Sequence, residues 1–299
     1  MNSIFSFSFL VLMTFFSTIG LAQDPAAKVT PAAIAARIAE HRMGEIVVKT
    51  KPGAPVRVEQ LRHEFLFGTA IPNSLAENDA HPMSAQDRDM YLKVLSENFN
   101  YAVHENALKW YATEKEENAV DYSVADRIWE LCAERNIPMR GHCIFWAKDK
   151  YVMPWLKELD ADELRAAVGR RALDVTRHFK GRIDEFDLNN EMIHGDFFRR
   201  RLGSGIINEM ALWARMGNPE AQLYLNDYGV LDGGFNADTY LWQIRTFLAS
   251  GVPIDGIGCQ AHLAHSYESI TSPEHVQKWL DILAEFNLVE HVSDHPWPG

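Results

Sequence analysis

The chain has 299 residues, of which 47% are hydrophobic and 23% charged, and this composition excludes a disordered protein. The formal net charge is −12, from 41 acidic and 29 basic residues. A net-acidic protein repels the phosphates of nucleic acids unless basic residues cluster, and the densest basic run is only Arg199-Arg200-Arg201. We therefore expect no nucleic-acid partner.

Residues 4–22 contain no charged side chain and are mostly apolar. The run ends in Gly20-Leu21-Ala22, a pattern of small residues that signal peptidase accepts, and polar residues follow from Gln23. A membrane anchor is the alternative, but a spanning helix needs about 20 strongly apolar residues, and hydroxyl side chains dilute this run. We expect residues 1–22 to be a cleaved signal peptide and the mature protein to be secreted, extracellular or periplasmic, with no membrane attachment.

Residues 23–62 are predicted to form a lead-in of one helix and one β-hairpin. Thr30 is a suitable N-cap and Pro31 a suitable first residue for a helix over 31–43. Apolar and polar residues alternate over 45–51 and 56–61, around the turn-forming segment Lys51-Pro52-Gly53-Ala54-Pro55. A period of two on both sides of a turn signal is typical of a β-hairpin.

From residue 63 to residue 299, short apolar runs alternate with amphipathic segments. The runs predict strands at 65–70, 99–104, 139–145, 183–189, 222–226, 254–259 and 289–293. The amphipathic segments predict helices at 86–97, 123–135, 161–179, 206–216, 237–250 and 273–286. Alternation of this kind indicates an α/β domain with a parallel sheet and helices packed outside it.

Two parallel architectures fit this alternation. A doubly wound nucleotide-binding fold would carry a glycine-rich turn after its first strand, whereas Phe67-Gly68-Thr69-Ala70-Ile71-Pro72 has one glycine. The phosphate-binding motif G-x-x-x-x-G-K-[ST] does not occur in the chain either. We therefore expect a (β/α)8 TIM barrel, in which functional side chains lie at the C-terminal ends of the strands.

Polar residues gather at the predicted strand ends. A lone Glu or His at such a position most often caps a helix or satisfies a buried polar group. Here five consecutive strands end in polar sets, which indicates an enzyme. The sets lie at residues 104–110, 142–146, 187–191, 226–228 and 260–262.

Glu191 is the candidate catalytic acid. Hydrolysis of a glycosidic bond needs one protonated carboxyl group for the leaving oxygen and a second carboxylate at the oxocarbenium-like centre. Glu191 ends an apolar strand and enters a loop, so partial burial is expected to raise its pKa toward neutrality and keep it protonated. Trp110 and Trp146 lie beside polar strand ends and offer aromatic faces on which sugar rings can stack.

Six short motifs in this order resemble those of the family 10 glycoside hydrolases, the retaining endo-β-1,4-xylanases. The resemblance covers residues 63–288 and implies a catalytic barrel that acts on xylan or xylo-oligosaccharides, with no cofactor and no metal ion. The motifs lie at residues 67–70, 105–110, 140–146, 186–191, 225–228 and 254–263.

The resemblance implies roles for individual residues. Glu191 matches the family's general acid/base, and the preceding Asn190 matches the Asn that contacts the reacting sugar. Glu105, Asn106 and Lys109 match the three residues that grip the xylose at the distal glycone site.

His142 and Trp146 match the residues that wall the subsite of the reacting sugar. His262 matches the family's His that hydrogen-bonds the nucleophile. Tyr228 and Gln260 lie in two further matching segments and are candidates for substrate binding.

The sequence departs from the family's pattern at three positions. Ala147 replaces a His that often follows the Trp, and Asn189 replaces an aliphatic residue. Asp294 stands where the family has its nucleophilic Glu, and its side chain is one methylene shorter. Because a strand eight and last helices are not found after it, we expect a truncated, incomplete barrel that folds poorly and hydrolyses xylan weakly or not at all.

Two alternatives remain open at this point. The first is a non-catalytic xylan-binding remnant that keeps the grip of Glu105, Asn106 and Lys109. The second is a metal-dependent hydrolase suggested by His262-x-x-His265, which lacks an acidic partner at ligand spacing. The sequence does not predict the oligomeric state.

Overall fold

A computed structural model describes residues 30–41, 43–59, 61, 64–76, 83–262 and 271–293. The predicted signal peptide, His265 and Asp294 lie outside these ranges. The chain divides into two compact units, Met1–Ile46 and Val47–Gly299. Within the described ranges, no helix has the length and apolar character needed to cross a membrane.

The predicted N-terminal helix is confirmed as α1 (Pro31–His41). The Thr30 hydroxyl accepts a hydrogen bond from the N–H of Ala33 at 3.2 Å, and its carbonyl accepts one from Ile34 at 2.9 Å. The side-chain bond satisfies one of the backbone N–H groups that have no partner within a first helical turn, and the carbonyl bond is the first of the helix.

The predicted β-hairpin is wrong. Residues 43–59 contain a turn, in which the N–H of Ala54 donates to the carbonyl of Lys51 at 3.1 Å, but they contain no strand. Ile46 and Val58 are 74% and 67% exposed. Their alternating apolar pattern therefore has no core to pack against, and a two-stranded hairpin alone is marginally stable.

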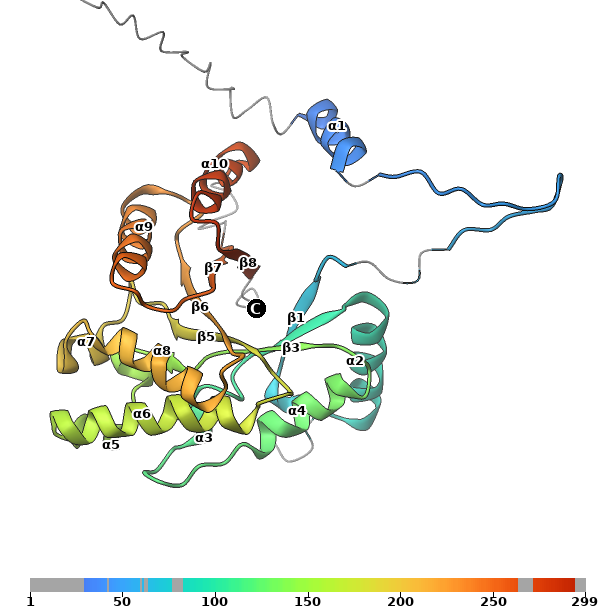
Figure 1. The fold of residues 1–299 in the computed structure, drawn as a ribbon. Helices are drawn as coiled ribbons and strands as arrows, with labels where there is room; N and C mark the ends of the chain where they lie inside the picture. The colour runs from blue at the N-terminus through green and yellow to red at the C-terminus, as the bar shows by residue number, and fades with distance from the viewer. Residues whose placement is uncertain are drawn as a thin grey trace, which may run out of the picture. The chain divides into compact units, whose positions relative to one another are not determined.

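The second unit contains one parallel sheet, and all seven predicted strands are found in it (Figure 1). The predicted strand at 139–145 is divided into two short strands, β3 and β4. The strands are β1 (Gly68–Ile71), β2 (Tyr101–His104), β3 (Met139–Gly141), β4 (Phe145–Trp146), β5 (Glu185–Asn190), β6 (Gln222–Tyr228), β7 (Gly256–Gln260) and β8 (Val289–Ser293).

The strand order is β1-β2-β3-β5-β6-β7-β8, with β4 paired to β5, and every pair is parallel. Over the described residues, β1 and β8 end this path and are not paired with each other. The expected α/β barrel architecture, incomplete over the described residues, is therefore confirmed.

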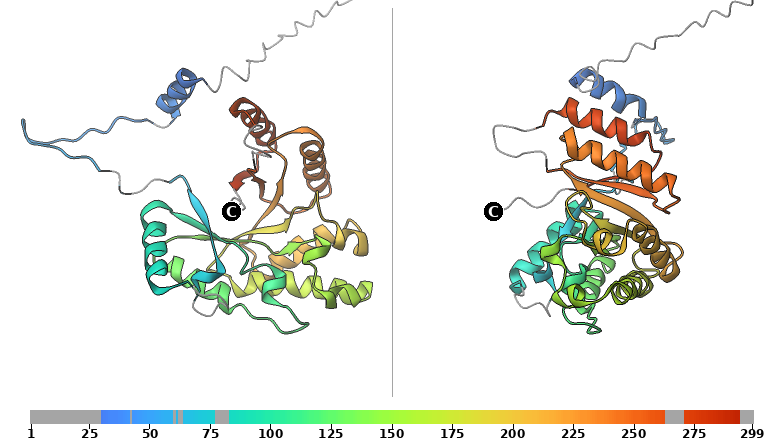
Figure 2. Two further views of the ribbon diagram at one scale, coloured as in Figure 1. Left: turned by 180° about the vertical axis from the view of Figure 1, so that it is seen from behind. Right: turned by 90° about the vertical axis from the view of Figure 1, so that its left-hand side faces the viewer.

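All six predicted helices of this unit are found, and they follow one another around the outside of the curved sheet (Figures 1 and 2). Three short helices, α3, α5 and α7, and two 3-10 turns, η2 and η3, were not predicted. The elements are η2 (Asn73–Leu75), α2 (Ala85–Asn98), α3 (Trp110–Thr113), α4 (Ser123–Ala133), η3 (Asp149–Tyr151), α5 (Pro154–Glu158), α6 (Ala161–His178), α7 (Phe197–Leu202), α8 (Ile206–Gly217), α9 (Gly234–Ala249) and α10 (Pro273–Ala284).

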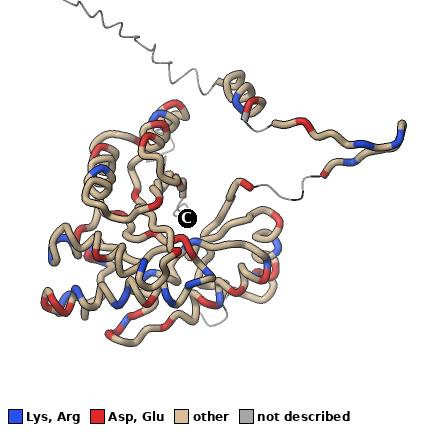
Figure 3. Tube along the Cα trace, in the orientation of Figure 1, with Lys and Arg blue, Asp and Glu red and all other residues tan. Residues whose placement is uncertain are grey.

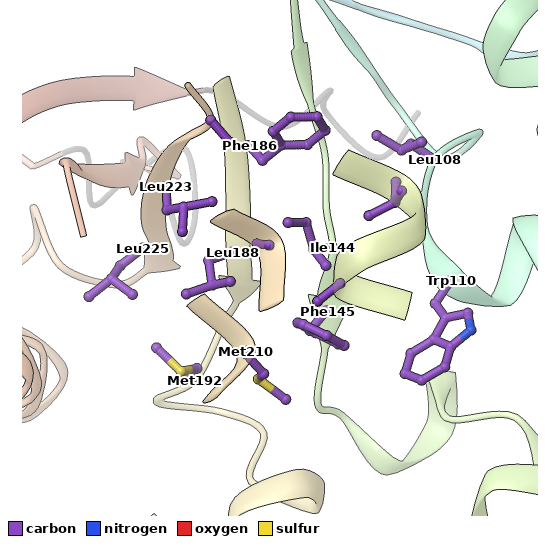
Figure 4. Close-up of a cluster of buried hydrophobic side chains, with 14 of the residues drawn as sticks. Leu108, Trp110, Ile144, Phe145, Phe186, Leu188, Met192, Met210, Leu223 and Leu225 are labelled. Carbon is purple, nitrogen blue, oxygen red and sulfur yellow. The ribbon is translucent and has the colours of Figure 1, made fainter. Parts of the chain in front are cut away.

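The hydrophobic core lies between the sheet and these helices. Figure 4 shows Phe186 and Leu188 of β5, Leu223 and Leu225 of β6, and Met210 of α8, all fully buried. Removing such side chains from water is the main favourable term in folding. The core holds the central strands in place, so that their C-terminal ends form a fixed platform.

A polar network crosses the inner side of the sheet. The Tyr101 hydroxyl on β2 donates to the Glu185 carboxylate on β5. Arg140 on β3 lies 2.9 Å from the Nδ1 of His291 on β8 and 3.5 Å from the carboxylate of Asp187 on β5. These contacts tie four strands together beneath the platform.

Candidate active site

A cleft of about 510 Å³, counted with its open mouth, lies at the C-terminal ends of the strands. Most of the residues that the sequence singled out line it, although they come from five different strands and the loops after them. The predicted residues that line the cleft are Glu105, Lys109, His142, Trp146, Asn190, Glu191 and Gln260. Asn106 contacts Lys109 and His262 contacts Gln260 of this lining, and Tyr228 stands opposite Gln260 in the sheet.

Glu191 follows β5 with a backbone φ of +57°, a left-handed conformation that is uncommon for a residue other than glycine. Its N–H donates to the carbonyl of Asn226 at 2.7 Å, and the residue is 7% exposed. Its Oε2 accepts from the indole N–H of Trp146 at 3.0 Å, and its Oε1 accepts from Gln260 at 3.3 Å. Glu191 is therefore held by β6 through its backbone and by β4 and β7 through its carboxyl group.

Lys148 changes the expected protonation of Glu191. Its Nζ lies 2.5 Å from the Glu191 Oε2. Burial raises the pKa of Glu191, but the ammonium group and the N–H donors of Trp146 and Gln260 outweigh it, so the pKa lies below its ordinary value. The expectation of a raised pKa is thus wrong for the protein without substrate, because the sequence does not reveal that Lys148 lies next to Glu191.

Amide side chains connect the ends of β5, β6 and β7. The Asn190 Oδ1 accepts from Asn226 at 3.1 Å and from Gln260 at 3.2 Å. The register brings them together, because Asn190 stands opposite Asn226 and Tyr228 stands opposite Gln260. His262 lies next to this group, with its Nε2 3.2 Å from the Oε1 of Gln260.

Lys109 and Asn106 form one side of the cleft. The ammonium group of Lys109 donates to the Asn106 Oδ1 at 3.0 Å and lies 4.4 Å from the centroid of the Trp146 ring. The Tyr111 hydroxyl donates to the same Asn106 oxygen at 3.0 Å. In this arrangement Asn106 holds Lys109 in place, while Glu105 and Lys109 face the cleft.

His142 is held by Asp187, with 2.6 Å between Nδ1 and the carboxylate. Burial raises the pKa of Asp187, but the effects of Arg140 and His142 are larger together and lower this pKa below its ordinary value. The carboxylate is therefore ionised. Burial lowers the pKa of His142. A neutral His142 next to a carboxylate must carry its proton on Nδ1, which leaves Nε2 free to accept a hydrogen bond from a sugar hydroxyl.

Asp227, Tyr228 and His194 form a further cluster near Glu191. The rings of His194 and Tyr228 stack with centroids 3.8 Å apart. The Asp227 carboxyl accepts from the backbone N–H of Ile193 at 2.8 Å and from that of Tyr228 at 3.0 Å. Burial raises the pKa of Asp227 to about 7.

Sequence reasoning missed Lys148, Asp227 and His194 as parts of this site. Each lies within three residues of a predicted site residue, because Lys148 follows Trp146, Asp227 precedes Tyr228 and His194 follows Glu191. Extending the search for polar residues past the strand ends would have found them. Their contacts with Glu191 and with one another cannot be read from that proximity.

The metal-dependent alternative has no site in the described ranges, where no three His, Cys, Asp or Glu side chains lie close enough to hold a metal ion. His265, on which that alternative depended, is outside them.

Comparisons with known proteins identify the family to which the motifs in the cleft point. Residues 58–294 match the model of "Glycosyl hydrolase family 10". Endo-1,4-beta-xylanase 1 of Arabidopsis thaliana is 39% identical over 214 residues, and anti-sigma-I factor RsgI6 of Acetivibrio thermocellus is 35% identical over 239. These matches cover 71% and 78% of this chain but only 22% and 30% of the two relatives.

A solved structure shows the same fold. The crystal structure of xylanase 10B from Thermotoga petrophila in complex with xylobiose aligns with a TM-score of 0.64 and 25% identity. The alignment covers 75% of this chain and 67% of that one. Since the family model spans most of the chain and its motifs converge on one cleft, this protein belongs to glycosyl hydrolase family 10.

Proposed function

We propose that this protein is a secreted glycoside hydrolase that cleaves β-1,4-xylosidic bonds within xylan by a retaining mechanism. The observation that carries the proposal is the position of Glu191, which is held by Trp146 and Gln260 inside a cleft lined by sugar-compatible side chains. The names of the relatives support xylan as the substrate. The uncharged apolar run over residues 4–22 supports secretion.

The cleft offers the two kinds of contact that a xylan chain needs. Trp146 lines the cleft and gives it an apolar wall against which a sugar can pack, and its ring is held between Tyr151, with centroids 3.8 Å apart, and the ammonium group of Lys109. Glu105, Lys109 and His142 provide charged and neutral partners for hydroxyl groups. An uncharged sugar chain would bind through these groups without displacing the buried amide network behind them.

Glu191 acts as the general acid/base in the proposed reaction. In its protonated form it donates a proton to the leaving glycosidic oxygen, while a second carboxylate attacks the anomeric carbon and forms a covalent glycosyl-enzyme. The ionised Glu191 then takes a proton from a water molecule whose oxygen attacks the anomeric carbon. This attack breaks the bond between the sugar and the second carboxylate and releases the sugar with retained configuration. Asp294, the residue proposed for the second carboxylate, follows β8, whose last residue Ser293 lines the cleft.

The Glu191→Gln variant tests this assignment. Hydrolysis of xylan should fall by about 10²- to 10⁴-fold, because its sugar leaving group needs a proton. Formation of the glycosyl-enzyme from an aryl xyloside with a good leaving group should fall much less, because that group departs without one. Steady-state and burst-phase rates on both substrates would check this.

The matched control is Glu130→Gln, which removes an exposed carboxylate on α4 and should leave both rates unchanged. Small losses of equal size on both substrates would remove Glu191 from the role of acid/base.

One observation favours a second function, that of a xylan-binding protein without turnover. The position that the resemblance assigns to the nucleophile holds Asp294 instead of Glu. Calorimetric titration with xylohexaose, followed by analysis of the sugars recovered, distinguishes the two functions. Binding with release of shorter sugars supports the hydrolase, and binding with intact xylohexaose supports the binding protein.

A further inference from the structure

Lys148 contacts Glu191 but has no role in the proposed reaction. It lies in the loop between β4 and η3, and its side chain is 20% exposed. Its Nζ lies 2.5 Å from the Glu191 Oε2 and donates to the Tyr228 hydroxyl at 3.3 Å. The same Nζ lies 4.8 Å from the centroid of the Tyr228 ring. Two elements other than its own therefore fix this ammonium group.

The backbone around Lys148 is packed against the loop that follows Glu191. The N–H of Phe197 donates to the carbonyl of Ala147 at 3.1 Å. A Cβ atom on Gly195 would lie 2.7 Å from the backbone nitrogen of Lys148, so only glycine allows this approach. The lysine therefore reaches Glu191 from a fixed position.

Other charged groups near Glu191 are engaged elsewhere. Arg140 and His142 contact Asp187, and Lys109 contacts Asn106. Among the described residues, Lys148 is the cation that the structure pairs with Glu191.

Two titratable groups lie near Glu191, His194 in the loop after β5 and Asp227 near the end of β6. His194 contacts the carbonyl of Tyr228, and Asp227 accepts two backbone N–H groups. Glu105 lines the same cleft. Neither Asp227 nor Glu105 can carry a positive charge, so neither can form an ion pair with Glu191.

We propose that Lys148 is a positioning residue that keeps Glu191 ionised and so sets the pH range in which Glu191 can donate a proton. The inference rests on the proposed function, because it concerns the same acid/base. Since an ion pair stabilises the carboxylate, Lys148 restricts the acid step to lower pH and favours the later step, in which Glu191 takes a proton from water.

The first experiment measures protonation directly and needs no turnover. The Glu191 carboxyl ¹³C resonance is identified by its loss in Glu191→Gln, and its titration midpoint is measured in the full chain and in variants. Lys148→Met should raise the midpoint by about one pH unit or more. A close positive charge lowers the pKa of a carboxyl group by about that amount, and the variant loses this charge. Lys148→Arg should keep the midpoint within a few tenths of a unit, because it keeps the charge.

The matched control is Lys150→Met, which removes a nearby lysine whose Nζ lies over the Tyr151 ring at 4.6 Å. This change should leave the midpoint unchanged. An unchanged midpoint in Lys148→Met, with a melting temperature that shows an intact fold, would overturn the inference.

The second experiment follows kcat/KM against pH on xylosides with poor and good leaving groups. In Lys148→Met, kcat/KM at pH 7 for the xyloside with the poor leaving group should rise up to about tenfold. A titration midpoint that is one pH unit higher increases the protonated fraction of Glu191 by about that factor. The value on the good leaving group should not change. Equal losses on both substrates at every pH would assign Lys148 a purely structural role. If the protein shows no turnover, the proposed function fails, and the titration still decides the role of Lys148.

Discussion

Single residues in the cleft owe their protonation to burial and to one or two neighbours. Glu191 and Asp227 show opposite outcomes although both are buried carboxyl groups. Lys148 lowers the pKa of Glu191 against the effect of burial. Asp227 has two backbone N–H donors, which do not offset burial, and its pKa rises to about 7. A paired cation, more than burial, therefore decides which of the two is ionised at neutral pH.

Asp227 should make stability depend on pH in a defined window. The folded carboxyl group titrates near pH 7 and the unfolded one near its ordinary value of 3.8. The contribution of Asp227 is therefore complete below about pH 4, declines as the pH rises, and is lost above about pH 7. Each unit of difference corresponds to about 1.4 kcal/mol.

Comparison with Asp227→Asn isolates this contribution, because other buried groups such as His104 titrate in both proteins. Denaturant unfolding at pH 4, 5.5, 7 and 8 should show the free energy of wild type falling relative to the variant up to pH 7. Parallel stability curves for the two proteins would contradict the prediction.

At the scale of elements, α6 is joined to the site loops by one buried side chain. Arg171 is 3% exposed, and its guanidinium group donates to the carbonyl of Leu108 at 2.6 Å and to that of Ile144 at 3.2 Å. The Leu108 carbonyl lies in the loop after β2, next to Lys109 in the chain. The Ile144 carbonyl lies just before β4, two residues from Trp146. The helix therefore holds in place the loops that carry the candidate sugar-binding side chains.

The Arg171→Met variant should destabilise the protein by about 3–5 kcal/mol, because it leaves buried carbonyl groups without donors. The matched control is Arg170→Met, which changes an exposed arginine on the same helix and should have little effect. Thermal unfolding of the three proteins would check this. Similar melting temperatures for the two variants would show that Arg171 does not hold the loops.

At the scale of the whole molecule, acidic and basic residues are interspersed along the outer helices (Figure 3). The net charge of −12 is thus spread over many positions and not concentrated in one field. The cleft itself contains both signs, which suits a neutral substrate rich in hydroxyl groups.

Export should remove residues 1–22. N-terminal sequencing of protein recovered outside the cytoplasm should begin at Gln23, because signal peptidase cleaves after small residues such as Ala22. Ala22→Arg should block this cleavage and leave the longer form attached to the membrane. Secreted protein that begins at Met1 would show that the segment is not a signal peptide.

The order of strands and helices, and the choice of residues at the strand ends, follow from the sequence alone. Periodicity of two or 3.6 residues is a local property, and parallel strands bring their C-terminal ends to one edge of a sheet, so β2, β5 and β7 could be assigned together with the residues after them. The absence of a hairpin in the described residues of 45–61 could not be predicted, because alternation forms a strand only where a core covers it. The ion pair of Lys148 and Glu191 depended on tertiary structure for a similar reason. Two residues 43 positions apart meet only because β4 pairs with β5, and this proximity decides the charge of the proposed acid/base.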